Sequence, residues 1–279
     1  MATDAIPKPA FPVPPADAAK HHVQTHLTYH LYDGLPTADV YPERDPLTDR
    51  PVGSAIFPHT ITDVTGNEQD YTLDNAGFQF VHHESKEKDF KDEDKIKREY
   101  YPEVMELLKQ VTGGSRVFVF DHTVRNKKES LTVGGPVQKV HVDHSYADVP
   151  RLVKFHLPDE AEELLKRRVQ VVNVWRPIKP IYKDPLAVAD KRTVPEEDLL
   201  TQKTVFPRYQ LEAFALKPNP AHKFYYRYGQ TPDIVTLIKT YESKTDGVAR
   251  NCPHSSFVNP ETVNYPVRES IETRCIIFH

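Results

Sequence analysis

The stretch VQKVHVDH, residues 137–144, mixes aliphatic and polar side chains in alternation and places a histidine and an aspartate two positions apart. A period of two is typical of a β-strand, in which every second side chain points to the same face. His141 and Asp143 are therefore expected to share a face and could bind one metal ion. By itself the pair fits equally well a surface histidine beside a solvated aspartate, because the chain has 14 His and 40 acidic residues.

Strand-like segments of the same kind dominate the chain. Runs rich in Val, Ile, Phe, Tyr and Thr recur between turns that contain Pro, Asp or Gly. We predict strands at 24–34, 53–64, 76–82, 115–121, 137–142, 169–175, 223–228, 234–240 and 271–278. Helices are predicted only at 92–112 and 158–168, and the polar residues 122–136 are predicted to form a loop. The 25 prolines against 10 glycines also argue against an architecture of long helices.

This pattern predicts a mainly β fold with peripheral helices. Many short strands with long connections are typical of a double-stranded β-helix, the jelly-roll or cupin-like core. We expect one domain over 26–279, preceded by a Pro/Ala-rich arm at 1–25. The segment 178–220 contains six prolines and is expected to be an insertion or a lid rather than core.

Composition excludes several classes of protein. The formal charge of −4, without a local cluster of Lys and Arg, argues against a nucleic-acid partner. No apolar run approaches the roughly 20 residues of a membrane span, and no signal peptide is evident. Two cysteines make no disulfide framework, and nucleotide-binding and serine-hydrolase motifs are absent. We therefore expect a cytoplasmic enzyme that acts on a small molecule, with a homodimer as a possible assembly.

A third metal ligand is expected at His254, which lies beside the strand-like segment HSSFV. Two histidines and one carboxylate form the facial triad of non-haem iron(II) oxygenases, which leaves three metal positions open for oxygen and a co-substrate. The ligand set that we predict is therefore His141, Asp143 and His254, with no catalytic residue beyond these ligands.

Fourteen positions after His254, the sequence reads Arg268-Glu269-Ser270. The distal carboxylate of 2-oxoglutarate needs a planar, bidentate donor, and arginine supplies one. A hydroxyl two residues along a strand faces the same way, so Arg268 and Ser270 are the predicted co-substrate anchors. Arg268 could instead pair with an acidic neighbour on a surface strand. Arg274 lies an even number of positions after Arg268, so on a strand it would face the same way. It is a second candidate for the anchor.

Several longer segments carry a family resemblance. They are GFQFVHHESKEKDFKDEDKIKREYYPEV (77–104), RVFVFDHTVR (116–125), VHVDHS (140–145), VVNVWRPI (171–178), DPLAVAD (184–190), RNCPHSSF (250–257) and RESIETR (268–274). In this order they resemble the fungal gibberellin-desaturase-like, or cephem-methoxylase-like, oxygenases. The resemblance implies a double-stranded β-helix, iron(II), 2-oxoglutarate and O2 as cofactor and co-substrates, and a role in fungal secondary metabolism. It places the metal ligands on His141, Asp143 and His254, and the 2-oxoglutarate arginine on Arg268.

Three further residues are candidates for substrate binding. His122 ends a predicted strand and could reach the mouth of the barrel. Asn173 is a polar residue in an apolar strand, where it could hold a carboxylate or order water, although a satisfied core amide fits as well. Arg176 could bind an acidic substrate or the co-substrate, or pair with an acidic residue.

The function we expect is oxidation of a C–H bond of a small molecule, by hydroxylation, desaturation, cyclisation or endoperoxidation. Two alternatives stay open on the residues alone. One is an iron-dependent oxidase that does not use 2-oxoglutarate, and the other is a non-catalytic jelly-roll protein that binds a metabolite.

Overall fold

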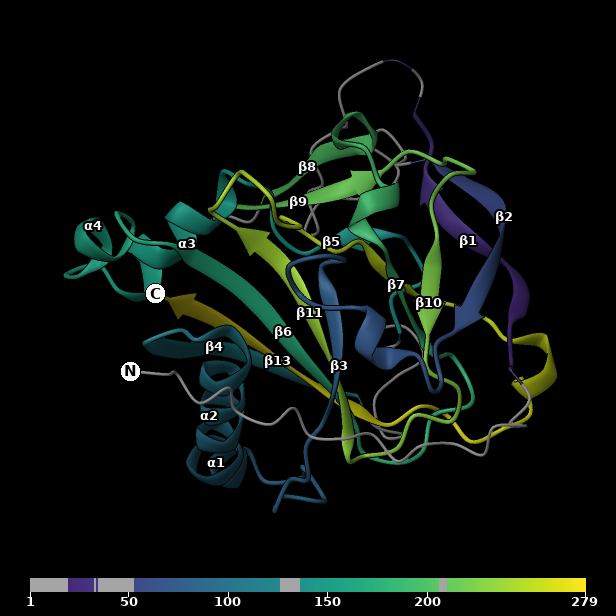
Figure 1. Cartoon of the computed structure of the whole chain (residues 1–279), viewed down its shortest axis with the longest axis horizontal. Coiled ribbons are helices and arrows are strands. Elements are labelled where there is room, and N and C mark those ends of the chain that lie inside the picture. The colour runs from purple at the N-terminus through teal and green to yellow at the C-terminus, as the bar shows by residue number, and fades with distance from the viewer. Residues whose placement is uncertain (1–19, 33, 35–52, 126–135, 206–209) are drawn as a thin grey trace.

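Two β-sheets form the body of the protein in the computed structural model, which describes residues 20–32, 34, 53–125, 136–205 and 210–279 (Figure 1). The larger sheet has eight strands in the order β1-β2-β10-β7-β12-β5-β9-β8, and the smaller has five in the order β3-β11-β6-β13-β4. Their bounds are β1 Val23–His30, β2 Ser54–Asp63, β3 Phe78–His82, β4 Arg116–Arg125, β5 His141–Val142, β6 Val169–Pro177, β7 Leu186–Ala189, β8 Leu199–Val205, β9 Gln210–Leu216, β10 Phe224–Tyr226, β11 Ile234–Glu242, β12 His254–Ser256 and β13 Ser270–Phe278. The mainly β jelly-roll fold expected from the sequence is confirmed.

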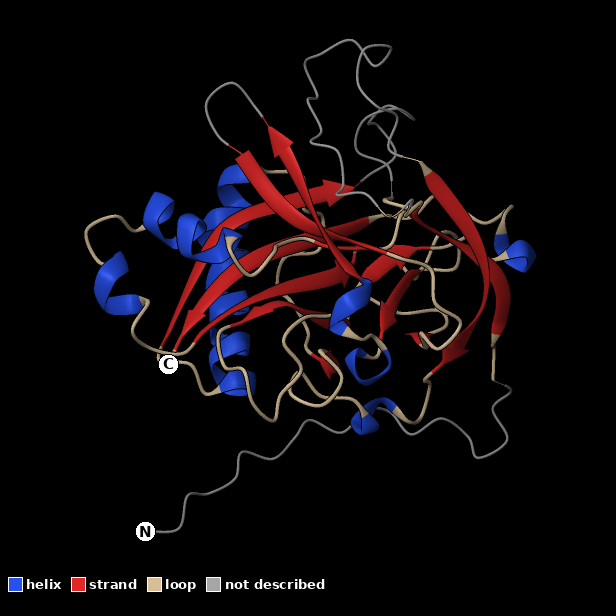
Figure 2. Cartoon of the chain, turned by 90° about the horizontal axis from the view of Figure 1, so that it is seen from above, coloured by secondary structure: helices blue, strands red, loops and turns tan. Residues whose placement is uncertain are grey.

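The helices are short and peripheral, as predicted, and Figure 2 shows the longer ones on one flank of the strands. They are α1 Glu93–Lys95, α2 Tyr101–Thr112, α3 Asp148–His156 and α4 Ala161–Leu164, with a π-helical turn at Ile96–Tyr100 that joins α1 to α2. In the described chain there are also four single 3-10 turns, at Glu68–Asp70, Lys191–Thr193, Glu196–Asp198 and Pro260–Thr262. Among the described helices none is both long and apolar enough to cross a bilayer.

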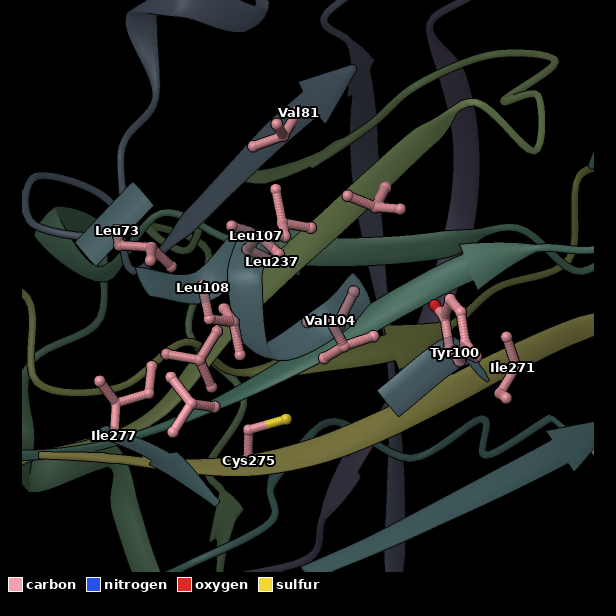
Figure 3. Packing of buried hydrophobic residues seen from close by; sticks show 14 of the residues in the cluster. Leu73, Val81, Tyr100, Val104, Leu107, Leu108, Leu237, Ile271, Cys275 and Ile277 are labelled. Atoms are coloured by element: carbon pink, nitrogen blue, oxygen red, sulfur yellow. The ribbon is translucent and has the colours of Figure 1, made fainter. Parts of the chain in front are cut away.

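The helix predicted at 92–112 is confirmed. The Asp92 side chain accepts a hydrogen bond from the Lys95 amide and caps its start, and Gly113, at φ +72°, ends it in the left-handed conformation that glycine favours. Its buried side, which includes Val104 and Leu108, packs against the five-stranded sheet (Figure 3). Removing these apolar side chains from water stabilises the sheet by roughly 1.5–3 kcal/mol for each one fully buried.

Strand β13 separates two environments. Ile271, Cys275 and Ile277 point into the helix-covered core. Because side chains alternate along a strand, Glu272 and Arg274 point to the opposite side, where both line a pocket between the two sheets. One central strand therefore supplies apolar residues to the core and charged residues to the pocket.

Several expectations about single elements are corrected by the structure. The loop predicted at 122–136 begins too early, because β4 continues to Arg125 through pairing with β13; residues 126–135 lie outside the described chain. The helix predicted at 158–168 is reduced to α4, and α3 was not expected. Most of the proline-rich arm at 1–25 also lies outside the described residues, and β1 begins at Val23.

The segment 178–220 is not peripheral to the sheets. It supplies β7, β8 and β9 to the eight-stranded sheet, and β7 pairs with both β10 and β12. Ala187, Val188 and Ala189 are fully buried. Prolines lie between these strands rather than within them, which is why a proline-rich segment can still form sheet. A lid role for the remaining connections stays a prediction.

A buried chain of polar side chains crosses the interior beside β1. The Tyr29 hydroxyl lies 2.8 Å from Nε2 of His59 and 3.2 Å from Nδ1 of His222, whose Nε2 lies 3.1 Å from Asp198. Burial, and then the nearby His222, lower the pKa of His59 to about 4. Burial also lowers the pKa of His222, in spite of Asp198.

These pKa values predict acid-labile folding. The unfolded chain binds more protons than the folded chain between pH 6.5, the ordinary histidine pKa, and about 4. Stability is therefore fully present above that window and is lost as the pH falls through it. We expect the free energy of unfolding, measured with urea, to be lower at pH 5 than at pH 7. The His59→Gln variant should lose less on the same change, and equal slopes for both proteins would contradict the assignment to His59.

Candidate metal centre

A pocket between the two sheets contains the predicted metal ligands. Its walls come from β5, β7 and β12 of the larger sheet and from β4, β6, β11 and β13 of the smaller one. The lining residues are Arg125, Val137, His141, Asp143, Trp175, Leu186, Ile238, His254, Ser255, Ser256, Arg268, Glu272 and Arg274. The pocket thus combines apolar walls with charges of both signs.

His141 and His254 face each other across two neighbouring strands. The antiparallel pairing of β5 with β12 sets the two histidines directly opposite, and their rings lie 4.5 Å apart. Nδ1 of His141 is 2.7 Å from the Lys139 carbonyl, and Nδ1 of His254 is 3.1 Å from the Cys252 carbonyl. Because a carbonyl oxygen can only accept a hydrogen bond, each Nδ1 must carry a proton and donate it in that hydrogen bond. Each Nε2 then keeps its lone pair, and the carbonyl fixes the ring as in metal-binding histidines.

Asp143 completes the group just beyond the end of β5. Its Oδ1 lies 3.3 Å from Nε2 of His141 and 3.7 Å from Nε2 of His254. The three potential ligand atoms lie within 4.8 Å of one another, and they form the one such group found among the described residues. Two imidazole nitrogens and one carboxylate oxygen match the donor preferences of iron(II) in a facial triad. The residues present therefore fit an iron(II) ion.

The electrostatics keep Asp143 ionised. Burial alone would raise the pKa of its carboxyl, but the neighbouring His141, His254 and Arg274 side chains hold that pKa well below its usual range. Burial, and then His141, lower the pKa of His254, which favours the neutral imidazole that binds metals.

Arg268 lies at the other end of the pocket, just before β13. Its Nη1 donates to the Asp184 carbonyl at 2.9 Å, and the guanidinium lies 5.5 Å from the centre of the Trp175 ring. Its buried Nε has no hydrogen-bond partner among the described residues. Burial, and then the charge of Arg125, lower the pKa of Arg268 to about 10, so it stays protonated at neutral pH. A buried cation with an unpaired N–H suits the carboxylate of a small ligand.

Two features fix the surroundings of Arg268. Asp184 has φ +51° and precedes Pro185, and its carbonyl also accepts a hydrogen bond from the Ser256 hydroxyl at 3.0 Å. A non-glycine residue in this conformation costs of order 1–3 kcal/mol and persists only where its surroundings hold it. Ser270 opens β13 and is paired with Arg125 of β4 and Pro177 of β6.

Arg274, the second candidate for the anchor, is occupied by carboxylates. Its Nη1 is 2.7 Å from Asp121, its Nε is 3.5 Å from Oδ2 of Asp143, and its Nη2 is 3.7 Å from Glu272. Arg274 therefore pairs with the carboxylates around it, including Asp143, and Arg268, whose Nε is unpaired, is better placed to receive a ligand carboxylate.

Of the predicted substrate residues, His122 lies away from the pocket. Its Nδ1 is 2.7 Å from the Tyr101 hydroxyl, and its Nε2 is 3.1 Å from Glu93, both on the helical segment. It pairs with Thr273 across β4 and β13, so it points to the helix-covered side of the sheet. The expectation that it reaches the barrel mouth is corrected by this register.

Arg176 also points away from the pocket. Its guanidinium donates to the Tyr100 hydroxyl and to the carbonyls of His83 and Pro232, at 2.6–3.0 Å. It is buried on the helix side and joins the ends of several segments, so the expectation that it binds the substrate or the co-substrate is corrected. Asn173 does hold a carboxylate, because its Nδ2 lies 2.6 Å from Oδ2 of Asp143.

Glu272 is the functional candidate that the sequence reasoning missed. It lines the pocket with only 9% of its surface exposed. The strand parity that related Arg268 to Arg274 could have identified it, since Ser270, Glu272 and Arg274 occupy alternate positions of β13.

Comparisons with known proteins agree with this fold. A family model described as an oxidoreductase/YMDC permease-like domain matches residues 32–278. The hydroxylase/desaturase efuI of Hormonema carpetanum is 36% identical over 247 residues, which cover 79% of this chain and 83% of that protein. The alpha-ketoglutarate-dependent dioxygenase phiK of a fungal species is 35% identical over 220 residues, covering 75% and 80%. The solved iron and alpha-ketoglutarate-dependent endoperoxidase NvfI superposes with a TM-score of 0.84 at 26% identity, covering 92% and 98%.

This chain therefore belongs to the fungal family of iron(II)- and 2-oxoglutarate-dependent oxygenases. The expected enzyme class, co-substrates and setting in fungal secondary metabolism are confirmed. The alternatives of an oxidase without 2-oxoglutarate and of a non-catalytic binding protein are set aside on the same grounds.

Proposed function

We propose that His141, Asp143 and His254 hold the iron(II), and that Arg268 and Ser270 bind the distal carboxylate of 2-oxoglutarate. The observation that carries the proposal is the convergence of two Nε2 atoms and Oδ1 within 4.8 Å in a pocket that also holds the unpaired Nε of Arg268. When iron(II) and 2-oxoglutarate are bound, O2 would supply the oxidising power that removes a hydrogen from a substrate C–H bond, and 2-oxoglutarate would supply the other two electrons that reduce O2.

The protein's own residues would bind and orient the reactants. The histidine rings are fixed by backbone carbonyls, so the ligand geometry is formed before the metal binds. The apolar side chains of Trp175, Leu186 and Ile238 in the pocket wall would limit access of water. Substrate placement against this wall would decide among hydroxylation, desaturation, cyclisation and endoperoxidation.

The substrate is proposed to be a small molecule, in keeping with a pocket between the two sheets. A cytoplasmic location and a homodimer stay predictions from the sequence. Sedimentation equilibrium of the purified protein measures its mass in solution and so tests the homodimer directly.

The ligand assignment predicts a loss of metal binding in Asp143→Ala. Removing a charged ligand should weaken Mn(II) binding by at least about 10–100-fold, the range seen when only the outer partners of metal ligands are removed. Electron paramagnetic resonance of free Mn(II) measures the dissociation constant. Asp233→Asn, which changes a carboxylate paired with His82 3.0 Å away, serves as the control. If the Asp143→Ala variant bound Mn(II) as tightly as wild type, Asp143 would not be a metal ligand.

The anchor assignment predicts that Arg268→Gln weakens binding of 2-oxoglutarate to the Mn(II)-loaded protein by about 1.5–3 kcal/mol, the contribution of a charged hydrogen bond. Trp175 is the only tryptophan of the chain and lies beside Arg268, so its fluorescence reports binding without turnover. Arg116→Gln, which removes an exposed partner of Glu160, is the matched control. If Arg274→Gln lost 2-oxoglutarate while Arg268→Gln kept it, the anchor would be Arg274.

The backbone of Asp184 gives a separate prediction. Glycine and asparagine tolerate a positive φ, whereas a β-branched residue does not. Asp184→Gly and Asp184→Asn should therefore keep the carbonyl directed at Arg268, and Asp184→Val should displace it and weaken 2-oxoglutarate binding by about tenfold. The same fluorescence titration measures all three. Equal affinities would show that the Asp184 carbonyl does not position Arg268.

A further inference from the structure

We propose that Glu272 is a positioning residue that, through Asn173 and Arg274, keeps Asp143 bound to the metal through a single oxygen. This inference rests on the proposed function, in which Asp143 is a metal ligand. It assigns a role to a buried carboxylate that the ligand set and the co-substrate anchor leave unexplained.

Asn173 is the first link between the two carboxylates. Its Nδ2 lies 2.6 Å from Oδ2 of Asp143 and 2.7 Å from Oε1 of Glu272. A side-chain amide nitrogen has two N–H groups, so one donates to each carboxylate. The opposite orientation of the amide would place its oxygen against two carboxylate oxygens and is therefore disfavoured. The amide is fully buried, and β6–β13 pairing sets Asn173 opposite Arg274.

Arg274 is the second link. Its Nε lies 3.5 Å from Oδ2 of Asp143, and its Nη2 lies 3.7 Å from Oε2 of Glu272. The guanidinium thus stands between two negative groups that would otherwise repel each other in a buried setting. Its third contact, with Asp121 at 2.7 Å, holds it at the edge of the pocket.

These contacts divide the two oxygens of Asp143. Oδ2 is held by Asn173 and Arg274, while Oδ1 faces both histidines. A carboxylate held in this way presents one oxygen to a metal, and with the two imidazoles it leaves three positions open. Bidentate 2-oxoglutarate and oxygen need all three. If Oδ2 were released, it could take one of them and compete with the co-substrate.

Glu272 acts in this arrangement by holding the amide and the guanidinium in place. Its Oε1 accepts a hydrogen bond from one N–H of the Asn173 amide, which leaves the other N–H directed at Asp143. Its negative charge balances the positive charge of Arg274. Among the described residues Glu272 does not join the group of close ligand atoms formed by His141, Asp143 and His254. A direct metal-ligand role is therefore a distinct outcome of the test.

The test measures two affinities separately in Glu272→Ala, Glu272→Gln and the control Glu269→Gln. Glu269 lies three positions before Glu272, is not part of the pocket wall, and pairs with Lys179 at 2.8 Å. Electron paramagnetic resonance gives the Mn(II) dissociation constant, and Trp175 fluorescence gives the 2-oxoglutarate dissociation constant of the Mn(II)-loaded protein. Thermal melting checks that each variant is folded.

We expect Glu272→Ala to bind Mn(II) within about threefold of wild type, because Glu272 contacts Asn173 and Arg274 and not a ligand atom itself. It should bind 2-oxoglutarate about tenfold more weakly, about the effect of one lost hydrogen bond, because a released Oδ2 of Asp143 would compete with the co-substrate. Glu272→Gln keeps an acceptor for Asn173 and should recover most of the 2-oxoglutarate affinity. Glu269→Gln should match wild type in both. If Glu272→Ala does not fold, Asn173→Ala removes the same link and should show the same separation of the two affinities.

Two results would overturn the inference. Unchanged 2-oxoglutarate affinity in Glu272→Ala would show that Asp143 is positioned without it, and a large loss of Mn(II) binding would make Glu272 a ligand instead. A measurement on the wild-type protein separates failure of this inference from failure of the proposed function. If wild-type protein bound 2-oxoglutarate equally with and without Mn(II), the proposed metal centre itself would be wrong.

Discussion

The buried carboxylate of Asp143 is the group around which the charges of the pocket are arranged. A buried charge without partners is unstable, and Asp143 is surrounded by two imidazoles, an amide and a guanidinium. Each of these partners comes from a different segment of the chain. Neighbouring strands must therefore hold their register for this carboxylate to be compensated, and the same register creates the candidate metal site.

Alternation along single strands explains how a small fold builds both a core and a charged pocket. On β13, Ile271, Cys275 and Ile277 lie in the helix-covered core (Figure 3), and Glu272 and Arg274 on the other face line the pocket. A shift of one residue would exchange the two sets, placing Arg274 in the core and Cys275 at the pocket. Apolar packing against α2 therefore also determines which charged groups reach Asp143.

The features of the fold and the site that depend on local periodicity could be predicted from the sequence. Strand alternation predicted that His141 and Asp143 share a face, and apolar spacing predicted the helix at 92–112. The sequence was insufficient where pairing between distant strands decides the outcome. The direct pairing of His254 with His141 and the direction of His122 toward the helix follow from register, which no local pattern contains. Glu272 was missed because its role depends on an amide and a guanidinium that only the folded sheet brings beside it.

A crystal structure of the protein with Mn(II) and 2-oxoglutarate, prepared without oxygen, tests the central claim most directly. The account predicts one metal ion bound by Nε2 of His141, Nε2 of His254 and Oδ1 of Asp143 alone, with the distal carboxylate of 2-oxoglutarate on Arg268. Metal bound elsewhere, or through both oxygens of Asp143, would contradict it.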